Sequence, residues 1–213
     1  MSEETSLVIA IDGPAASGKS TVAKRLAAEL QIVFVSSGGM YRAFTWWVLE
    51  NGVDPTDTVA VEELLEKTVF QCGEKNNIGT IAINGQLPEW EQLANDRVNG
   101  RVSLVAAIPS VRSRLVDEQR AYARERGVVM EGRDIGSVVF PDTPYKFYID
   151  ASPEVRERRR RAEGIDDSIA ARDKMDSSRK ASPLVIPKDA TVVDSSHLTI
   201  EEVVEKLKEV IVG

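Results

Sequence analysis

The sequence contains only one cysteine, Cys72, and one histidine, His197, among its 213 residues. A single cysteine excludes an intrachain disulfide, and so few cysteines and histidines exclude a metal site rich in these residues. This cysteine usage is typical of proteins of the reducing cytoplasm, where we expect the chain to be located.

Long apolar runs are lacking as well. No run approaches the roughly 18 residues that a membrane-spanning helix needs. The N-terminal MSEETSLVIAIDGP has no basic segment followed by a long apolar one, so we expect neither a membrane span nor a secretory signal. The formal net charge is −7, which argues against a nucleic-acid-binding surface and favours a monomer. An anion site must therefore be a local cluster of arginine and lysine.

Short apolar runs alternate with helical patterns along the chain, which predicts an α/β fold with a parallel five-stranded sheet flanked by helices. We expect a helix to begin at residue 41 and another at Thr199, where Glu202 completes a capping box. Residues 58–95 combine a helical segment with a hairpin pattern and are predicted to form a small insert in one domain of residues 1–213. The predicted strands lie at 7–11, 32–35, within 127–134, at 146–150 and at 191–194.

The segment GPAASGKST, residues 13–21, joins the first predicted strand to the first predicted helix. It matches G-x-x-x-x-G-K-[ST], in which glycines let main-chain N–H groups surround phosphate oxygens at the N-terminus of a helix. Lys19 is expected to reach the β- and γ-phosphates of a nucleotide, and the Ser20 hydroxyl to bind Mg²⁺. Asp12, at the end of the preceding strand, is open to two interpretations: a contact to a metal-bound water, or stabilisation of the turn.

Arginines recur near the ends of the predicted strands and helices, which favours binding of a second phosphorylated molecule, because guanidinium groups pair with phosphate bidentately. Arg172, Asp176 and Arg179 share one helical face, a spacing that suits a sugar hydroxyl beside a phosphate but more commonly marks a solvated, salt-bridged face. The arginines considered are Arg42, Arg112, Arg133, Arg172 and Arg179.

Seven segments, in chain order, resemble the bacterial cytidylate kinases, which belong to the nucleoside monophosphate kinases with a phosphate loop (P-loop). They are IDGPAASGKST, SSGGMYR, VSLVAAIPSVR, EGRDIGSVVFPD, KFYIDASPEVR, RDKMDSSRKASPL and DSS. The resemblance implies a P-loop kinase core, a nucleoside-monophosphate-binding insert at 58–95 and a short lid at 156–172. It also implies transfer of the ATP γ-phosphate to CMP or dCMP with Mg²⁺.

The resemblance further implies a role for individual residues. ATP would be bound by the loop residues Gly13, Pro14, Ala15, Ala16, Ser17, Gly18, Lys19, Ser20 and Thr21. The monophosphate would face Ser37, Gly38 and Arg42; cytosine would contact Ser103, Arg112 and Asp134; the CMP phosphate would contact Arg133 and Arg179; and the sugar would contact Arg172 and Asp176. Catalysis is expected from Lys19, Arg133, Arg179 and a lid arginine, with Arg159 chosen from among Arg156, Arg159 and Arg160.

Departures from the family pattern and two alternative functions accompany this interpretation. The family commonly has aspartate where this chain has Ser36, and the segment LPEWEQLANDRVNG differs from the usual pattern, which leaves the choice between ribose and deoxyribose open. Another small P-loop metabolite kinase and a non-catalytic nucleotide sensor are the alternative functions.

Overall fold

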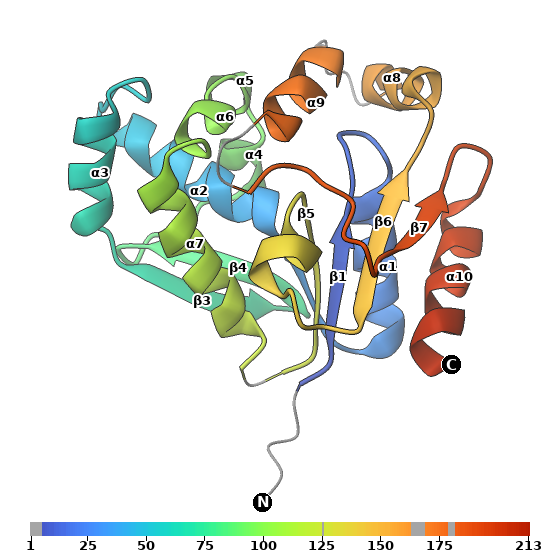
Figure 1. Ribbon diagram of the computed structural model, residues 1–213. Coiled ribbons are helices and arrows are strands. Elements are labelled where there is room, and N and C mark those ends of the chain that lie inside the picture. The colour runs from blue at the N-terminus through green and yellow to red at the C-terminus, as the bar shows by residue number, and fades with distance from the viewer. Residues whose placement is uncertain (1–5, 125, 163–168, 179–181) are drawn as a thin grey trace, which may run out of the picture.

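A computed structural model of the chain describes residues 6–124, 126–162, 169–178 and 182–213, except for the side chains of residues 171 and 172. The strands of this described part all belong to one sheet (Figure 1). They are β1 (Val8–Asp12), β2 (Val33–Ser36), β3 (Phe70–Lys75), β4 (Ile78–Ile83), β5 (Val128–Gly132), β6 (Tyr145–Asp150) and β7 (Thr191–Asp194).

The five predicted strands form the parallel core of the sheet in the order β2-β5-β1-β6-β7, which confirms the predicted fold class. The hairpin β3–β4 extends this core to a seven-stranded sheet. Strand β3 is antiparallel to β4, and β4 pairs with β2 at Phe34 and Ile78. The hairpin predicted within 58–95 thus continues the main sheet, and the assignment of 58–95 as an insert stays a prediction.

Helices cover both faces of the sheet (Figure 1). Alternation along β1 explains the two layers, because Ile9 and Ile11 pack in one core with α1 and α10, whereas Ala10 packs in the other core with α2 and α7. The helices are α1 (Lys19–Leu30), α2 (Ser37–Glu50), α3 (Thr58–Glu66), α4 (Trp90–Leu93), α5 (Asp96–Asn99), α6 (Val102–Val105), α7 (Pro109–Tyr122), the π-helix η1 (Ile135–Val139), α8 (Pro153–Ala162), α9 (Ile169–Ser177) and α10 (Ile200–Val212).

The helix predicted from residue 41 begins four residues earlier, at Ser37. Ser36 is its N-cap, and the Ser36 side chain accepts the N–H of Gly39 at 3.3 Å. The two glycines at the start of α2 disfavour a helix by intrinsic propensity, but the cap and the buried residues that follow outweigh this preference. Helix α2 consequently starts at the carboxyl end of β2, where the candidate site lies.

The last helix confirms the predicted capping box, in which Thr199 and Glu202 exchange hydrogen bonds between side chain and main chain. Val203, Val204 and Leu207 of this helix are buried, whereas Val210 in its last turn is 43% exposed. In the described part of the chain, no helix combines the length and apolarity needed to cross a membrane.

Candidate active site

The phosphate loop follows β1 and curls back over the sheet. A Cβ atom at Gly13 would lie 2.1 Å from the main-chain oxygen of Ile149, so only glycine fits where the loop passes β6. Gly18 has a φ of 88°, a conformation that favours glycine, and it caps the start of α1. The two glycines of the motif therefore have different reasons: Gly13 lies too close to β6 for a side chain, and Gly18 adopts a left-handed main-chain conformation.

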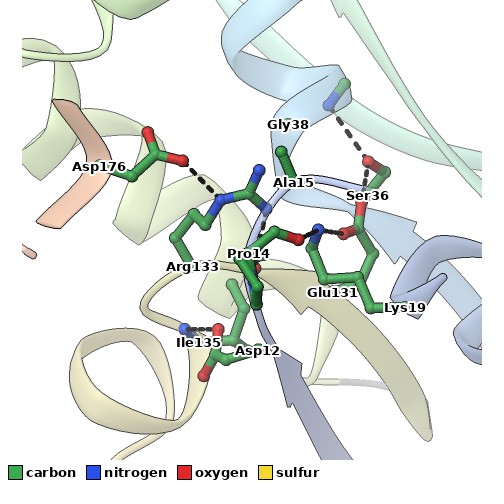
Figure 2. A network of polar contacts seen from close by, with 12 residues as sticks. Asp12, Pro14, Ala15, Lys19, Ser36, Gly38, Glu131, Arg133, Ile135 and Asp176 are labelled. Carbon is green, nitrogen blue, oxygen red and sulfur yellow. Dashed lines mark hydrogen bonds and ion pairs between the residues drawn. The ribbon is translucent and has the colours of Figure 1, made fainter. Parts of the chain in front are cut away.

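Lys19 is buried, with 5% of its surface exposed, in the first turn of α1. Its Nζ donates a hydrogen bond to the carbonyl oxygen of Pro14 at 3.0 Å and lies 3.9 Å from Oε2 of Glu131 (Figure 2). The loop thus holds its own lysine at the place where phosphate oxygens would be bound.

Glu131 is a site residue that sequence reasoning missed. It lies in β5, is 4% exposed, and its Oε1 accepts a hydrogen bond from the Ser36 hydroxyl at 2.5 Å (Figure 2). The register pairs Glu131 with Ser36 on one side and Ile11 on the other. A carboxylate at the end of a buried strand in VVMEGRD was the available signal, but only the strand order places it beside Lys19.

A buried ion pair lies in the part of the site where the monophosphate nucleotide is expected, which is called the acceptor side below. Nη2 of Arg112, on α7, is 2.6 Å from Oδ2 of Asp134, and both side chains are at most 4% exposed. Nη1 of Arg112 donates to the carbonyl oxygen of Ala106 at 3.0 Å, and the guanidinium lies 5.1 Å from the ring centroid of Tyr41. The structure therefore brings together two of the three residues predicted to read cytosine, and holds them in fixed positions.

A second ion pair connects the residue that follows β5 to α9. Nε of Arg133 donates to Oδ2 of Asp176 at 2.7 Å, with side-chain exposures of 19% and 4% (Figure 2). Arg172 lies in α9, but its side chain is outside the described part of the structure, and Arg179 is outside the described residues altogether.

Arg42 extends from α2 toward the short helices α5 and α6. It donates to the carbonyl oxygen of Gly38 at 3.2 Å and to Oδ1 of Asn99 at 3.3 Å. Asn99 is therefore a further neighbour of the site, in a segment whose sequence offered no recognisable motif.

One cavity of about 1110 Å³ joins these groups. Its walls run from the phosphate loop, across the carboxyl ends of β2 and β5, to helices α4, α6 and α7. The predicted site residues among its lining are Ala15, Ala16, Gly18, Lys19, Ser20, Thr21, Ser37, Gly38, Arg42, Ser103, Arg112, Arg133, Asp134 and Asp176. Residues of the donor side, where ATP is expected, and residues of the acceptor side thus line the same space.

The arginines of α8 differ in their placement. Nη1 of Arg156 is 2.5 Å from Oδ2 of Asp173 and 3.4 Å from the carbonyl oxygen of Ala15. Arg159 donates to the carbonyl oxygens of Ser17 and Ser195 at 3.0 and 2.8 Å. Arg160 lines the cavity. Two of the three candidate lid arginines therefore support the phosphate loop, and the catalytic role of Arg159 stays a prediction.

Asp12 is a buried carboxylate at the end of β1. Burial raises the pKa of Asp12 to about 7, and the N–H groups of Gly136 and Ile135 act in the opposite direction. Among the described residues, no group of three or more His, Cys, Asp and Glu side chains is placed to hold a metal ion.

A phosphate loop at the carboxyl end of a parallel sheet, with helices on both faces, defines the class of phosphate-loop nucleotide-binding proteins. The fold is similar to that of a gluconokinase from Sinorhizobium meliloti, with a TM-score of 0.50 and 11% sequence identity over 98% of this chain and 92% of that one. At this identity the likeness concerns the fold alone.

The family described as cytidylate kinase matches residues 9–212. A cytidylate kinase of Streptomyces avermitilis is 40% identical over 93% of this chain and 90% of its own length, and one of Clostridium botulinum strain Langeland is 42% identical over 95% and 96%. The chain belongs to the cytidylate kinase family, the ATP-dependent phosphotransferases that phosphorylate CMP and dCMP.

Proposed function

We propose that the chain transfers the γ-phosphate of ATP to CMP or dCMP inside the cavity, giving ADP and CDP or dCDP. The observation that carries this proposal is the continuity of the cavity, which connects Lys19 of the phosphate loop to the buried pair of Arg112 and Asp134. Phosphoryl transfer requires two phosphorylated substrates to be held in line, and one space with a phosphate site and a polar, buried far wall suits that requirement.

On the donor side, residues 13–21 bind the phosphates of ATP through main-chain N–H groups and the N-terminus of α1. Lys19 exchanges its contact with the carbonyl oxygen of Pro14 for the β- and γ-phosphates. Its burial supports this role, because a desolvated ammonium interacts strongly with the charge that develops during transfer.

Mg²⁺ fits the donors that line this part of the cavity. The Ser20 hydroxyl, in the first turn of α1, lines the cavity, and Mg²⁺ is commonly held by few protein ligands together with substrate phosphates and water. Ser20 is therefore the proposed protein ligand. When bound, the ion supplies neutralisation of phosphate charge.

On the acceptor side, Asp134 and Ser103 accept hydrogen bonds from the cytosine amino group, and Arg112 donates to the ring nitrogen and carbonyl. The contact between Arg112 and Oδ2 of Asp134 keeps the carboxylate oriented in the cavity wall. Uracil presents a carbonyl in place of the amino group, which leaves the carboxylate without its donor, and buried polar sites discriminate strongly against such analogues.

The monophosphate lies between the base-reading pair and the phosphate loop in this proposal. Arg42, Arg133 and Arg179 hold its oxygens, with Ser37 and Gly38 beside them, whereas Arg172 and Asp176 hold the sugar hydroxyls. The ion pair of Arg133 and Asp176 supports neighbouring roles for these two side chains.

The acceptor needs no general base, because its attacking atom is a phosphate oxygen that is already ionised. The side chains position the two substrates and neutralise charge, with Lys19, Arg133, Arg179 and Arg159 as the catalytic cations. Arg159 is anchored on the loop carbonyl of Ser17, which supports a place beside the donor phosphates. Residues 156–172 are proposed as the lid that excludes water during transfer.

The proposal is tested by measuring ADP release with ATP and Mg²⁺ in the separate presence of CMP, dCMP, UMP, AMP and GMP. Fast turnover confined to CMP and dCMP is expected. Turnover with a different monophosphate would contradict the base-reading roles, and binding without turnover would favour a nucleotide sensor. The ratio of the CMP and dCMP rates decides the sugar preference.

We further propose that the enzyme is a monomer located in the cytoplasm. Sedimentation of the purified chain tests the first statement, and the distribution of the chain in fractionated cells tests the second.

A further inference from the structure

The carboxylate of Asp12 connects the start of the phosphate loop to the start of η1, next to Arg133 and Asp134. Asp12 ends β1 directly before Gly13 of the phosphate loop and is 1% exposed. Its Oδ1 accepts the N–H of Ile135 at 2.8 Å, and its Oδ2 accepts the N–H of Gly136 at 2.7 Å. Figure 2 shows the Asp12 carboxylate beside Ile135, below Arg133. Both oxygens therefore bind amides that lie 123 and 124 residues further along the chain.

The two amides open η1, the π-helix that follows Arg133 and Asp134. The first N–H groups of a helix have no partner within the helix, so an acceptor from outside must satisfy them when they are buried. Asp12 supplies both acceptors. It thereby sets the position at which the chain turns after β5, and with it the positions of the two residues immediately before η1.

The turn has little freedom apart from these bonds. A Cβ atom at Gly132 would lie 2.5 Å from Oγ of Ser37, and one at Gly136 would lie 3.2 Å from Cγ of Lys146. Close packing of this kind transmits a displacement instead of absorbing it. A change at the Asp12 carboxylate is therefore expected to reach Arg133 and Asp134.

The geometry supports neither of the two interpretations that the sequence leaves open for Asp12. Its hydrogen bonds reach across to η1 rather than into its own loop. The described residues that line the cavity do not include Asp12, whereas Ser20, Arg133 and Asp134 are among them. The contacts thus differ from those of a residue that faces a metal-bound water or that stabilises its own turn.

We infer that Asp12 is a positioning residue for the acceptor nucleotide: it clamps the start of η1 so that Arg133 and Asp134 face CMP from a fixed distance to the phosphate loop. The inference rests on the proposed acceptor roles of Arg133 and Asp134. Loss of the clamp weakens CMP binding and base selection more than ATP binding.

The test is the Asp12→Asn variant, with Asp142→Asn as the matched control. Asparagine keeps the shape but offers one acceptor, and its amide group opposes one of the two N–H donors. Asp142 is exposed and follows the other end of η1. At pH 8, above the pKa of about 7 of Asp12, we expect KM for CMP to rise about tenfold and the CMP-to-UMP ratio of kcat/KM to fall, with KM for ATP changed less than about twofold. Asp142→Asn is expected to match the wild type.

Several outcomes would overturn the inference. An equal rise of both KM values would indicate general loosening, and a rise of KM for ATP alone would assign Asp12 to the phosphate loop. Unchanged kinetics with a lower melting temperature would leave Asp12 a purely structural residue. Failure of the proposed function is distinguishable, because the wild-type chain itself would then show no turnover of CMP.

A measurement on the wild-type chain decides the matter if Asp12→Asn does not fold. The amide NMR signals of Ile135 and Gly136 report on the clamp directly. Titration with CMP is expected to shift both signals more than titration with ATP does, because the clamp is coupled to the acceptor side. Signals that move only with ATP, or with neither nucleotide, would contradict the inference.

Discussion

The donor and acceptor sides of the cavity are built in different ways. The donor side consists of nine consecutive residues, 13–21, and acts mainly through main-chain groups at the start of α1. The acceptor side is assembled from side chains of α2, α6, α7, α9 and the segment that follows β5, and two of its arginines pair with aspartates, Arg112 with Asp134 and Arg133 with Asp176. A local motif therefore specifies the first, whereas packing between distant segments specifies the second.

This difference has an energetic consequence. Removing one member of a buried ion pair leaves the other member desolvated, which typically costs about 3–5 kcal/mol. Acceptor-side substitutions are therefore expected to lower both the free energy of unfolding and the affinity for the nucleotide. Substitutions that remove a contact between neighbouring residues, such as a helix cap, should lower the free energy of unfolding only slightly.

The largest effect is expected for Arg133→Ala. This variant removes a proposed phosphate-binding guanidinium and its bond to Asp176, so kcat/KM for CMP should fall by about 10²–10³-fold. Arg133→Lys keeps the charge but not the planar guanidinium, so its kcat/KM for CMP should lie between the values of the wild type and of Arg133→Ala. Steady-state kinetics at a temperature at which each variant is folded check this, and a near-wild-type rate for Arg133→Ala would refute the assignment.

The next effect concerns base selection. In Asp134→Asn the side-chain amide can donate to the uracil carbonyl, so the CMP-to-UMP ratio of kcat/KM should fall by about 10²-fold. Asp134→Ala should also erode this ratio, and in addition lower the free energy of unfolding, because Arg112 is buried beside it. Competition kinetics with both monophosphates measure the ratio, and an unchanged value in either variant would count against base reading by Asp134.

A smaller effect is expected on the boundary between the two sides, at Glu131. Glu131→Gln removes the negative charge 3.9 Å from Nζ of Lys19, and kcat/KM for ATP should fall about tenfold. Ser36→Ala removes only the hydroxyl that binds Glu131 and should have a smaller effect of the same kind. Equal losses in the two variants would indicate that the hydrogen bond, and not the charge, matters.

The smallest effect is expected for a purely local contact outside the cavity. Thr199→Ala removes the N-cap of α10 and should lower the free energy of unfolding by about 1 kcal/mol, with kcat and both KM values unchanged. Chemical denaturation combined with steady-state kinetics measures this. A change of kcat or of either KM in Thr199→Ala would contradict the expectation that local contacts outside the cavity affect stability alone.

Much of the fold could be predicted because its signals are local. Five short apolar runs became the five parallel strands, and Thr199 with Glu202 became the capping box of α10. The start of α2 was placed wrongly because the glycines at 38 and 39 disfavour a helix, and the contacts that outweigh them come from Ser36 and the core.

The candidate site was only partly predictable for a related reason. Arg112, Asp134 and Arg133 were expected there through family resemblance, and they do line one cavity. Glu131 and Asn99 escaped notice, because nothing near them in the sequence shows which strand or helix lies next to them. Arg159 binds the loop carbonyl of Ser17, a contact between residues 142 positions apart that no local pattern indicates, and its catalytic role stays a prediction.

The sequence by itself determined the alternation of strands and helices, the phosphate loop and the capping box of α10, because each depends on residues within a few positions of one another. Only the tertiary structure decided that β5 lies between β1 and β2, although it follows them by about a hundred residues. That placement brings Glu131 to Lys19 and the start of η1 to Asp12. The physical reason is that strand order is set by the burial of both faces of the sheet, which no local pattern encodes.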